Sequence, residues 1–439
     1  MNQFRLLGQR RFGPFFITET LAAFNDNAFR YALVGMATFE VALSQTALNA
    51  YINMALALFI LPFFVLSSTF GQLAEKFEKA RLIRWIKLLE IVTMVLAAIG
   101  FLTRNLDLLL VVLCLMGVLA TAFSPIKYAI VPQVLTTDEL TGGNGLVQSS
   151  TSLAILTGSL AGNALMAVPH IGPLLATVVV IAIAVAGLLS SLFIPPATPP
   201  VPQLVFQANP VIGTWRLMGH VGHEHTVFWS VIGVSWFWFF GATLTTQAPA
   251  YARDYLGGDA SVLNLILILF SVGVGIGSLL CEKLSAHQVN PGLVPLGALG
   301  MSVFGIDLYV THPSRSLVSG QDWLAVLHHA GGWHVALDLA LIGIFAGFYI
   351  VPMFTLLQHR SEPRRLARVI AGNNVVNALF MVLAAALGMA APHLGLNVPQ
   401  LIALVCVLNL AMLALLCWRV PEFWQRFTAW VRPRHSGHF

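Results

Sequence analysis

Long apolar runs recur along this chain and predict membrane-spanning helices. A helix needs roughly 20 apolar residues to cross the hydrocarbon core of a bilayer. On that basis the sequence predicts an all-α polytopic membrane protein with 12 transmembrane helices, arranged as two six-helix halves. The spans cover about residues 14–40, 49–72, 83–103, 106–131, 143–168 and 173–194, and then about 226–251, 261–283, 292–311, 334–357, 368–391 and 398–419.

A proline-rich segment separates the two sets of spans. Residues 195–202 include Pro195, Pro196, Pro199, Pro200 and Pro202, and a segment of this kind cannot be helical. We therefore expect an N-terminal half at 1–194, a cytoplasmic linker at 195–225, a C-terminal half at 226–419 and a cytoplasmic tail at 420–439.

Composition supports the membrane assignment. Charged residues make up 9% of the 439 residues and hydrophobic residues 57%, whereas a soluble domain carries about 25% charged residues. A soluble fold this apolar could not cover its surface with polar groups, but a bilayer removes that requirement. The composition therefore argues against a soluble enzyme.

The distribution of Lys and Arg predicts the orientation. Cytoplasmic loops of membrane proteins carry an excess of these residues. With the N-terminus in the cytoplasm, the inner side holds Lys76, Lys79, Arg81, Arg84, Lys87, Arg216, Lys283, Arg360, Arg364, Arg365, Arg368, Arg426, Arg432 and Arg434, and the outer loops hold Arg104, Arg253 and Arg315. Both termini are therefore expected in the cytoplasm. The net charge of +5 then faces anionic lipid, and no nucleic-acid partner is implied.

Two short patterns occur once in each half. Glu75-Lys76 follows the second span and Glu282-Lys283 follows the eighth, while Gly143-Asn144 and Gly372-Asn373 begin the fifth and eleventh spans. Equivalent positions in halves of equal topology predict a parallel repeat about an axis normal to the membrane. That arrangement is typical of the major facilitator superfamily.

The loop after the second span resembles the cytoplasmic loop motif of that superfamily. Its matching residues are Gly71, Glu75, Lys76, Lys79, Ala80 and Arg81, with Glu where Asp is usual and Ala where Gly is usual. A carboxylate at a helix end can pair with basic residues and hold one conformation. The alternative is that the charges only orient the loop. The recurrence of the Glu-Lys pair favours a gating set of Gly71, Glu75, Lys76, Arg81, Glu282 and Lys283.

Ionisable residues inside the spans are the first candidates for a binding site. Such residues cost about 2.5–3.5 kcal/mol at the centre of a membrane helix, so they need a reason to be there. Asp26 lies near the middle of the first span, and Arg30 follows at a spacing that permits pairing across one helical turn. The alternative is a purely structural ion pair that fixes this helix against its neighbours.

Further polar residues complete the predicted substrate site. Lys127 and Tyr128 lie near the inner end of the fourth span, where Lys127 could instead be a lysine that extends to the interface. Asn144 with Gln148, and Asn373 with Asn377, each share one helix face, which suits either hydrogen bonds between helices or a polar cavity lining. The predicted substrate-binding set is Asp26, Asn27, Arg30, Lys127, Tyr128, Asn144, Gln148, Asn373 and Asn377. The roles of Asp307 and Asp338 stay open, and Glu19 could be interfacial.

Three other patterns predict no chemistry. Gly273, Gly275 and Gly277 follow no strand and lie in an apolar span, so they indicate a helix-packing face and not a nucleotide loop. The histidines at 220, 223 and 225, and those at 328, 329 and 334, do not by themselves predict a metal site. We expect no cofactor, and no catalytic arrangement or ATP-binding loop is found in the sequence.

Three motifs together resemble one family within the superfamily. They are Phe24-Asn25-Asp26-Asn27-Ala28-Phe29, Phe123-Ser124-Pro125-Ile126-Lys127-Tyr128 and Gly143-Asn144-Gly145. The chain is similar to the bacterial lysophospholipid transporters over its whole length, most strongly in the first five spans. It departs from them at Leu244-Thr245-Thr246-Gln247, where a basic residue is expected, and in the eleventh span, which lacks the carboxylate that relatives can carry.

The resemblance implies a flippase of the bacterial inner membrane. It would move lysophosphatidylethanolamine-like lipids from the outer to the inner leaflet by alternating access, and a separate acyltransferase/acyl-acyl-carrier-protein synthetase would reacylate them. Asp26 would meet the ammonium group, and Arg30 or Lys127 the phosphate. The rivals are a proton-coupled drug or metabolite exporter, with Asp26 as proton carrier, and a non-transporting membrane scaffold or sensor.

Overall fold

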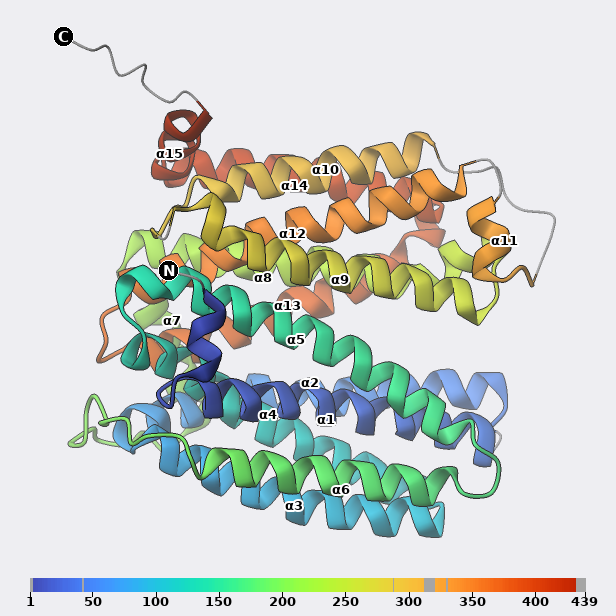
Figure 1. Cartoon of the computed structure of the whole chain (residues 1–439), viewed down its shortest axis with the longest axis horizontal. Coiled ribbons are helices and arrows are strands. Elements are labelled where there is room, and N and C mark those ends of the chain that lie inside the picture. The colour runs from blue at the N-terminus through green and yellow to red at the C-terminus, as the bar shows by residue number, and fades with distance from the viewer. Residues whose placement is uncertain (1–2, 42, 287, 312–319, 329–330, 432–439) are drawn as a thin grey trace. The chain divides into compact units, whose positions relative to one another are not determined.

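The computed structural model describes residues 3–41, 43–286, 288–311, 320–328 and 331–431. Within these ranges the chain is helical, with connecting loops and one isolated bridge between Gly258 and Gln321. His329 and the end of the predicted cytoplasmic tail lie outside the described residues. Figure 1 shows the helices coloured along the chain.

The helices follow the predicted spans closely. In the first half they are α1 (Gly13–Gly35, continued by a π-helix at Met36–Glu40), α2 (Gln45–Lys76), α3 (Lys79–Thr103), α4 (Leu106–Val134), α5 (Thr137–Met166) and α6 (Gly172–Ser191). In the second half they are α8 (His225–Asp254), α9 (Ala260–Leu284), α10 (Leu293–Val310), α12 (Gly332–Arg360), α13 (Leu366–Ala390) and α14 (Val398–Arg419). The largest difference is the start of α5, predicted at 143 and found at Thr137.

Ten helices in the described part of the chain are long and apolar enough to cross a membrane. They coincide with ten of the predicted spans. The other two spans fall on α1 and α5, which have 23 and 30 residues and are more polar. The chain is therefore a multi-pass membrane protein. These two more polar helices carry five of the nine predicted substrate-binding residues: Asp26, Asn27 and Arg30 on α1, and Asn144 and Gln148 on α5.

Short helices occupy the connections. They are a 3-10 helix at Gln3–Gly8, α7 (Pro210–His223), α11 (Trp323–His328), a 3-10 helix at Pro392–Leu394 and α15 (Glu422–Val431). The proline-rich segment 195–202 is not helical, as predicted. Helix α7 was not expected within the linker; Asn209 caps its first turn, and the helix packs on α2. Its Gly213 lies so close to α2 that a Cβ atom there would be 2.4 Å from the Ser68 hydroxyl oxygen.

The helices form two compact units. The first unit contains residues 1–136, 153–224 and 361–378, and the second contains 137–152, 225–360 and 379–439. Helices α5 and α13 are each divided between the units. The beginning of α5 belongs to the unit made mainly by the second half of the chain, and the beginning of α13 belongs to the unit made mainly by the first half.

The same packing pattern occurs inside each unit. In the first unit α2 packs on α4, α3 on α4 and α6, and α1 on α6 and α4. In the second unit α9 packs on α12, α10 on α12 and α14, and α8 on α14 and α12. These pairs correspond when α1, α2, α3, α4 and α6 are matched to α8, α9, α10, α12 and α14. The two halves are therefore pseudo-symmetric in their helix packing.

Glycines permit the closest helix contacts. A Cβ atom on Gly162 of α5 would lie 2.4 Å from the Ala28 carbonyl oxygen of α1. Cβ atoms on Gly273 and Gly277 of α9 would lie 2.4 Å and 2.0 Å from carbonyl oxygens of α12. Without strong hydrophobic attraction between helices in lipid, close backbone packing holds such pairs together. The predicted packing face at Gly273–Gly277 is confirmed.

Candidate functional site

A cluster of charged side chains lies inside the first unit, around Asp26 of α1. The Asp26 carboxylate is partly buried and interacts electrostatically with Glu90, Lys87, Arg30 and Lys127. Among the described residues it makes no hydrogen bond or ion pair. Charges of both signs from α1, α3 and α4 therefore gather around a carboxylate that has no direct partner of its own.

Arg30 does not pair with Asp26 across the helical turn. Its Nη2 atom donates to Asn27 Oδ1 at 2.5 Å, one residue further along α1 than the expected acceptor. Its guanidinium carbon lies 5.6 Å from the ring centroids of Tyr31 and Phe59. Long side chains on a helix lean toward its N-terminus, so residues at i−3 and i−4 are both within reach, and packing decides between them. In this structure Asn27 is the partner.

Lys127 is a buried residue and does not extend to the membrane interface. Its ammonium group donates to the Glu19 carboxylate of α1, and both side chains are almost fully inaccessible to solvent. Glu19 is therefore a buried counter-charge, and the interfacial interpretation of both residues is wrong. The Lys127 ammonium also lies 5.3 Å from the ring centroid of the neighbouring Tyr128.

One part of this cluster was missed by the sequence analysis. Lys87 of α3 donates to Glu90 at 2.6 Å, and the Asn25 amide donates to the other Glu90 oxygen at 2.8 Å. All three residues are buried. The signal was present, because Lys87 and Glu90 are ionisable residues in an apolar helix at i, i+3 spacing, the same kind of feature that identified Asp26.

The predicted amide pairs are divided between the two units. In the second unit Asn144 donates to Thr355 at 3.1 Å and to Gln358 at 2.6 Å, and Gln148 donates weakly to Ser152. Asn144 thus joins α5 to α12, which is the helix-to-helix alternative of the prediction.

Helix α13 carries the other amides, in the first unit. Asn374 accepts from Ser124 of α4 at 3.0 Å, while the Asn373 side-chain oxygen is buried and has no hydrogen-bond partner in the described part of the chain. Asn377 is half-buried. The first unit therefore holds Asp26, Asn27, Arg30, Lys127, Tyr128, Asn373 and Asn377.

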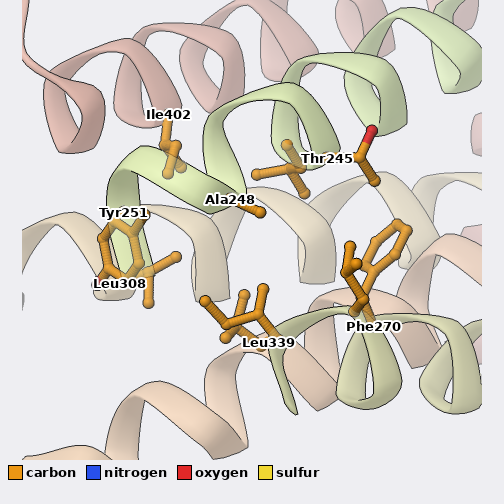
Figure 2. Close-up of a pocket in the computed structure, with 10 residues that line it drawn as sticks. Thr245, Ala248, Tyr251, Phe270, Leu308, Leu339 and Ile402 are labelled. Carbon is orange, nitrogen blue, oxygen red and sulfur yellow. The ribbon is translucent and has the colours of Figure 1, made fainter. Parts of the chain in front are cut away.

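The second unit contains an apolar pocket between α8, α9, α10, α12 and α14 (Figure 2). Its walls are mainly aliphatic and aromatic: Leu244, Thr245, Ala248, Tyr251, Ile266, Leu267, Phe270, Leu308, Leu339 and Ile402. Leu244 and Thr245 belong to the segment 244–247, at which the sequence departs from the expected basic residue. A pocket with this lining suits a hydrocarbon group and offers no charge to a headgroup.

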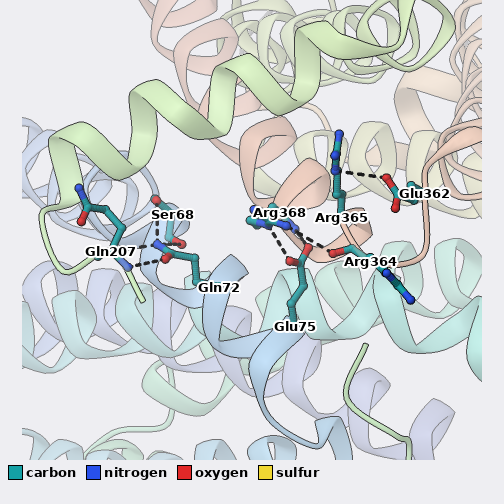
Figure 3. A network of polar contacts seen from close by, with 8 residues as sticks. All are labelled: Ser68, Gln72, Glu75, Gln207, Glu362, Arg364, Arg365 and Arg368. Atoms are coloured by element: carbon teal, nitrogen blue, oxygen red, sulfur yellow. Dashed lines mark hydrogen bonds and ion pairs between the residues drawn. The ribbon is translucent and has the colours of Figure 1, made fainter. Parts of the chain in front are cut away.

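The predicted gating carboxylate has a partner from the second half of the chain (Figure 3). Glu75 at the end of α2 accepts from the Arg368 backbone nitrogen of α13 at 3.1 Å and from Arg368 Nε at 2.6 Å. The Glu75 side chain is completely buried, and that of Arg368 is 16% exposed. A Cβ atom on Gly71, one turn earlier, would lie 2.7 Å from the Ala371 Cβ atom, so only glycine permits this contact.

The other predicted gating residues have different surroundings. Lys76 donates to the Leu204 carbonyl oxygen at 3.0 Å and so fastens the linker to α2. Arg81 and Lys283 are exposed, whereas Glu282 is buried at the equivalent end of α9. Figure 3 also shows Gln72 of α2 holding the linker through Gln207, at 2.8 Å and 3.3 Å.

Comparison with known proteins agrees with this architecture. The family model of the Major Facilitator Superfamily matches residues 15–385. Among solved structures, the superfamily transporter FucP in its outward conformation superimposes with a TM-score of 0.71 at 14% identity, covering 94% of this chain and 99% of that chain. The human organic anion transporter MFSD10 superimposes with a TM-score of 0.69 at 14% identity, covering 95% and 100%. These likenesses show the fold.

Relatives found by sequence similarity indicate a narrower family than the solved structures do. The Lysophospholipid transporter LplT of Enterobacter sp. (strain 638) is 30% identical over 354 residues, which cover 78% of this chain and 79% of that protein. The protein of the same name from Klebsiella pneumoniae (strain 342) is 28% identical over 414 residues, which cover 91% and 94%. The chain therefore belongs to the Major Facilitator Superfamily and, within it, to the family of the lysophospholipid transporters.

Proposed function

We propose that this protein carries lysophospholipids across the membrane and binds the headgroup at the charged cluster of the first unit. The observation that carries the proposal is the partly buried Asp26 carboxylate, which has no direct partner among the described residues and lies close to buried basic groups. Charges inside a membrane protein are functional candidates by default. The family relatives support a lysolipid over other charged substrates.

A zwitterionic headgroup matches the charges that remain available. Within the Lys127–Glu19 pair and within the Lys87–Glu90 pair, the two charges largely neutralise each other. The first pair joins α4 to α1, and the Asn25–Glu90 hydrogen bond joins α1 to α3. Asp26 is left to accept hydrogen bonds from an ammonium group. Arg30 donates to the neutral Asn27 amide and lies against the Tyr31 and Phe59 rings, and it can form a charge-assisted bond with a phosphate oxygen. Phosphatidylethanolamine-type lysolipids carry both groups.

As a separate proposal, the apolar pocket of the second unit, taken by itself, is a binding site for a hydrocarbon chain. A lysolipid has a single chain, and each buried methylene group contributes about 0.8 kcal/mol. The pocket residues are uncharged, and the Thr245 hydroxyl is bonded to backbone carbonyl oxygens of its own helix. Hydrocarbon therefore fits this lining better than a headgroup does.

We propose that transport proceeds by alternating access, and hydrogen bonds between helices of the two chain halves support this proposal. The Glu75–Arg368 pair joins α2 to α13 inside the first unit, and the Asn144–Thr355 bond joins α5 to α12 inside the second. Each bond links a helix of one half to a helix of the other, so rocking of one half against the other would break them. We propose that these bonds stabilise one end of the transport cycle and that Glu282 acts at the equivalent position of the second half.

The proposed location is the bacterial inner membrane with both termini in the cytoplasm. Transport would run from the outer to the inner leaflet, where a separate acyltransferase/acyl-acyl-carrier-protein synthetase would consume the substrate. The excess of Lys and Arg on one side supports this orientation. In intact cells an impermeant thiol reagent should miss Thr198→Cys and label His393→Cys on a Cys-free background. Labelling of both from outside would contradict the orientation.

Transport itself can be tested in vesicles. Protein in proteoliposomes should move a fluorescent lysophosphatidylethanolamine away from an impermeant quencher, and Asp26→Asn should slow this at least tenfold at normal folded yield. Asp107→Asn, an exposed carboxylate in the first turn of α4, is the matched control and should transport normally. Movement of a cationic dye driven by a pH gradient, without lysolipid movement, would replace this function with proton-coupled export.

If Asp26 were only structural, its change to Asn would reduce the amount of folded protein. The double variant Asp26→Asn with Arg30→Gln removes both charges and so distinguishes the two roles. Recovery of transport in the double variant would refute a headgroup role for these residues.

A further inference from the structure

Three potential metal ligands meet in the second unit, at the end of α10 and the start of α12. His334 Nε2 lies 2.9 Å from Asp307 Oδ2 and 3.8 Å from Asp338 Oδ2. One ligand atom from each residue falls within 4.8 Å of the others. The sequence separates Asp307 from His334 by a loop that is only partly described, so the cluster arises from the packing of α10 on α12.

Helix geometry explains how the ligands converge. His334 and Asp338 are four residues apart on α12 and share one face of that helix. Asp307 lies in the last turn of α10, which runs beside α12. The arrangement is thus built on two helices and not on a loop, which is what a precise ligand set requires.

Some buried polar atoms of the cluster lack a hydrogen-bond partner in the described part of the chain. His334 Nε2 can donate only one proton, and the nearest acceptor for that proton is the Asp307 carboxylate. Asp338 is 1% exposed, and its Oδ2 atom has no hydrogen-bond partner in the described part of the chain. The buried Tyr251 hydroxyl interacts electrostatically with Asp338 and is also without a hydrogen-bond partner there. A buried carboxylate oxygen in this state calls for a cation.

We propose that Asp307, His334 and Asp338 bind a divalent transition-metal ion, with Zn²⁺ as the best match. One imidazole nitrogen and two carboxylates are ligands that Zn²⁺ accepts in tetrahedral sites, with water in the fourth position. The Asp307 and His334 side chains are 39% and 48% exposed, so an ion can enter from solvent and keep a water ligand. Mg²⁺ and Ca²⁺ prefer oxygen ligands alone and fit less well.

A bound ion would join α10 to α12 and neutralise both carboxylates. Leu308 and Leu339 directly follow Asp307 and Asp338 in sequence, and both line the apolar pocket together with Tyr251. The site is separate from the Asp26 cluster, which lies in the other unit. The ion therefore acts as a structural or regulatory ligand of the second unit and takes no part in the proposed headgroup binding.

Titration calorimetry of the full-length protein in detergent, with Zn²⁺ as the probe, tests the assignment. Wild type should bind one Zn²⁺ per chain, and Mg²⁺ should not compete. Asp338→Asn, His334→Gln and Asp307→Asn should each weaken binding at least tenfold, since even outer-shell changes at metal sites cost about 10- to 100-fold. His393→Gln, an exposed histidine elsewhere in the second unit, should bind like wild type.

A second measurement covers the case in which the Asp338 variant does not fold. Co²⁺ bound to wild type should show visible absorption bands that disappear in His334→Gln, a variant of a half-exposed residue that folding should tolerate. Absence of Zn²⁺ binding to wild type would mean that the cluster is only a hydrogen-bonded His–Asp group and would overturn the proposal. Equal binding in the three cluster variants would place the ion elsewhere and would overturn it as well.

Discussion

Replacement of Glu75 by Gln should loosen the contact between α2 and α13. The Glu75 carboxylate is fully buried and accepts two hydrogen bonds from Arg368, one of them charge-assisted at 2.6 Å. Removing one partner of a buried pair costs about 3–5 kcal/mol because the other charge stays behind. Gln keeps the size of the side chain and can still accept from the Arg368 backbone nitrogen. We therefore take the lower end of this range, about 3 kcal/mol, as the cost of the substitution. Since 1.4 kcal/mol corresponds to a factor of ten, the population of conformations without this contact should increase about 100-fold.

Thiol labelling can measure that gain. Ala371 on α13 is completely buried, and it faces Gly71, one turn from Glu75. On a background without the four native cysteines, Ala371→Cys should react slowly with a maleimide while Glu75 is present. When closing is faster than labelling, the labelling rate follows the population of the open form. Glu75→Gln should therefore raise the rate by up to about 100-fold.

A matched control separates this pair from general surface charge. Glu362 forms an ion pair with Arg365 at 3.2 Å near the same end of α13, but its side chain is 52% exposed. Exposed pairs contribute about 0.2–1 kcal/mol, so Glu362→Gln should change the labelling rate by less than about fivefold. An unchanged rate in Glu75→Gln, or an equal increase in Glu362→Gln, would refute the reasoning.

Three further changes test other parts of the structure. Glu19→Gln removes the carboxylate that pairs with the buried Lys127, so it should destabilise the purified protein by about 3–5 kcal/mol and lower its melting temperature. Adding Lys127→Met should restore most of the lost stability, and a fully stable single variant would contradict the pairing. Gly162→Val places a side chain 2.4 Å from a carbonyl oxygen of α1 and should destabilise the protein by about 1–3 kcal/mol in the same melting assay. Gly219→Ala in α7 meets no atom within 4 Å and is its control; equal melting temperatures for the two variants would refute the close contact. Thr245→Phe reduces the apolar pocket and should slow vesicle transport of long-chain lysolipids more than short-chain ones, whereas an unchanged chain-length dependence would exclude the pocket as the acyl site.

The sequence alone determined the class of protein and the positions of its helices. Hydrocarbon thickness sets the length of a span, and every backbone polar group must be bonded within it, so apolar length is a sufficient signal. The ends of α3, α4 and α14 were predicted within a few residues for this reason. Asp26 was identified as a site candidate because a charge inside an apolar span is a one-dimensional anomaly that needs no knowledge of its neighbours.

Only the tertiary structure decided which polar groups meet. Glu75 was expected to pair with basic residues, but the sequence did not say which, and its partner is Arg368, which lies 293 residues further along the chain. Lys127 is bonded to Glu19, and Lys87 is bonded to Glu90. From hydropathy, Lys127, Glu19 and Lys87 were placed toward the cytoplasmic ends of their helices, and no pairing among them was visible. The partner of a buried charge depends on how distant helices pack. Helical periodicity describes the face of one helix and contains no information about the helix that covers it.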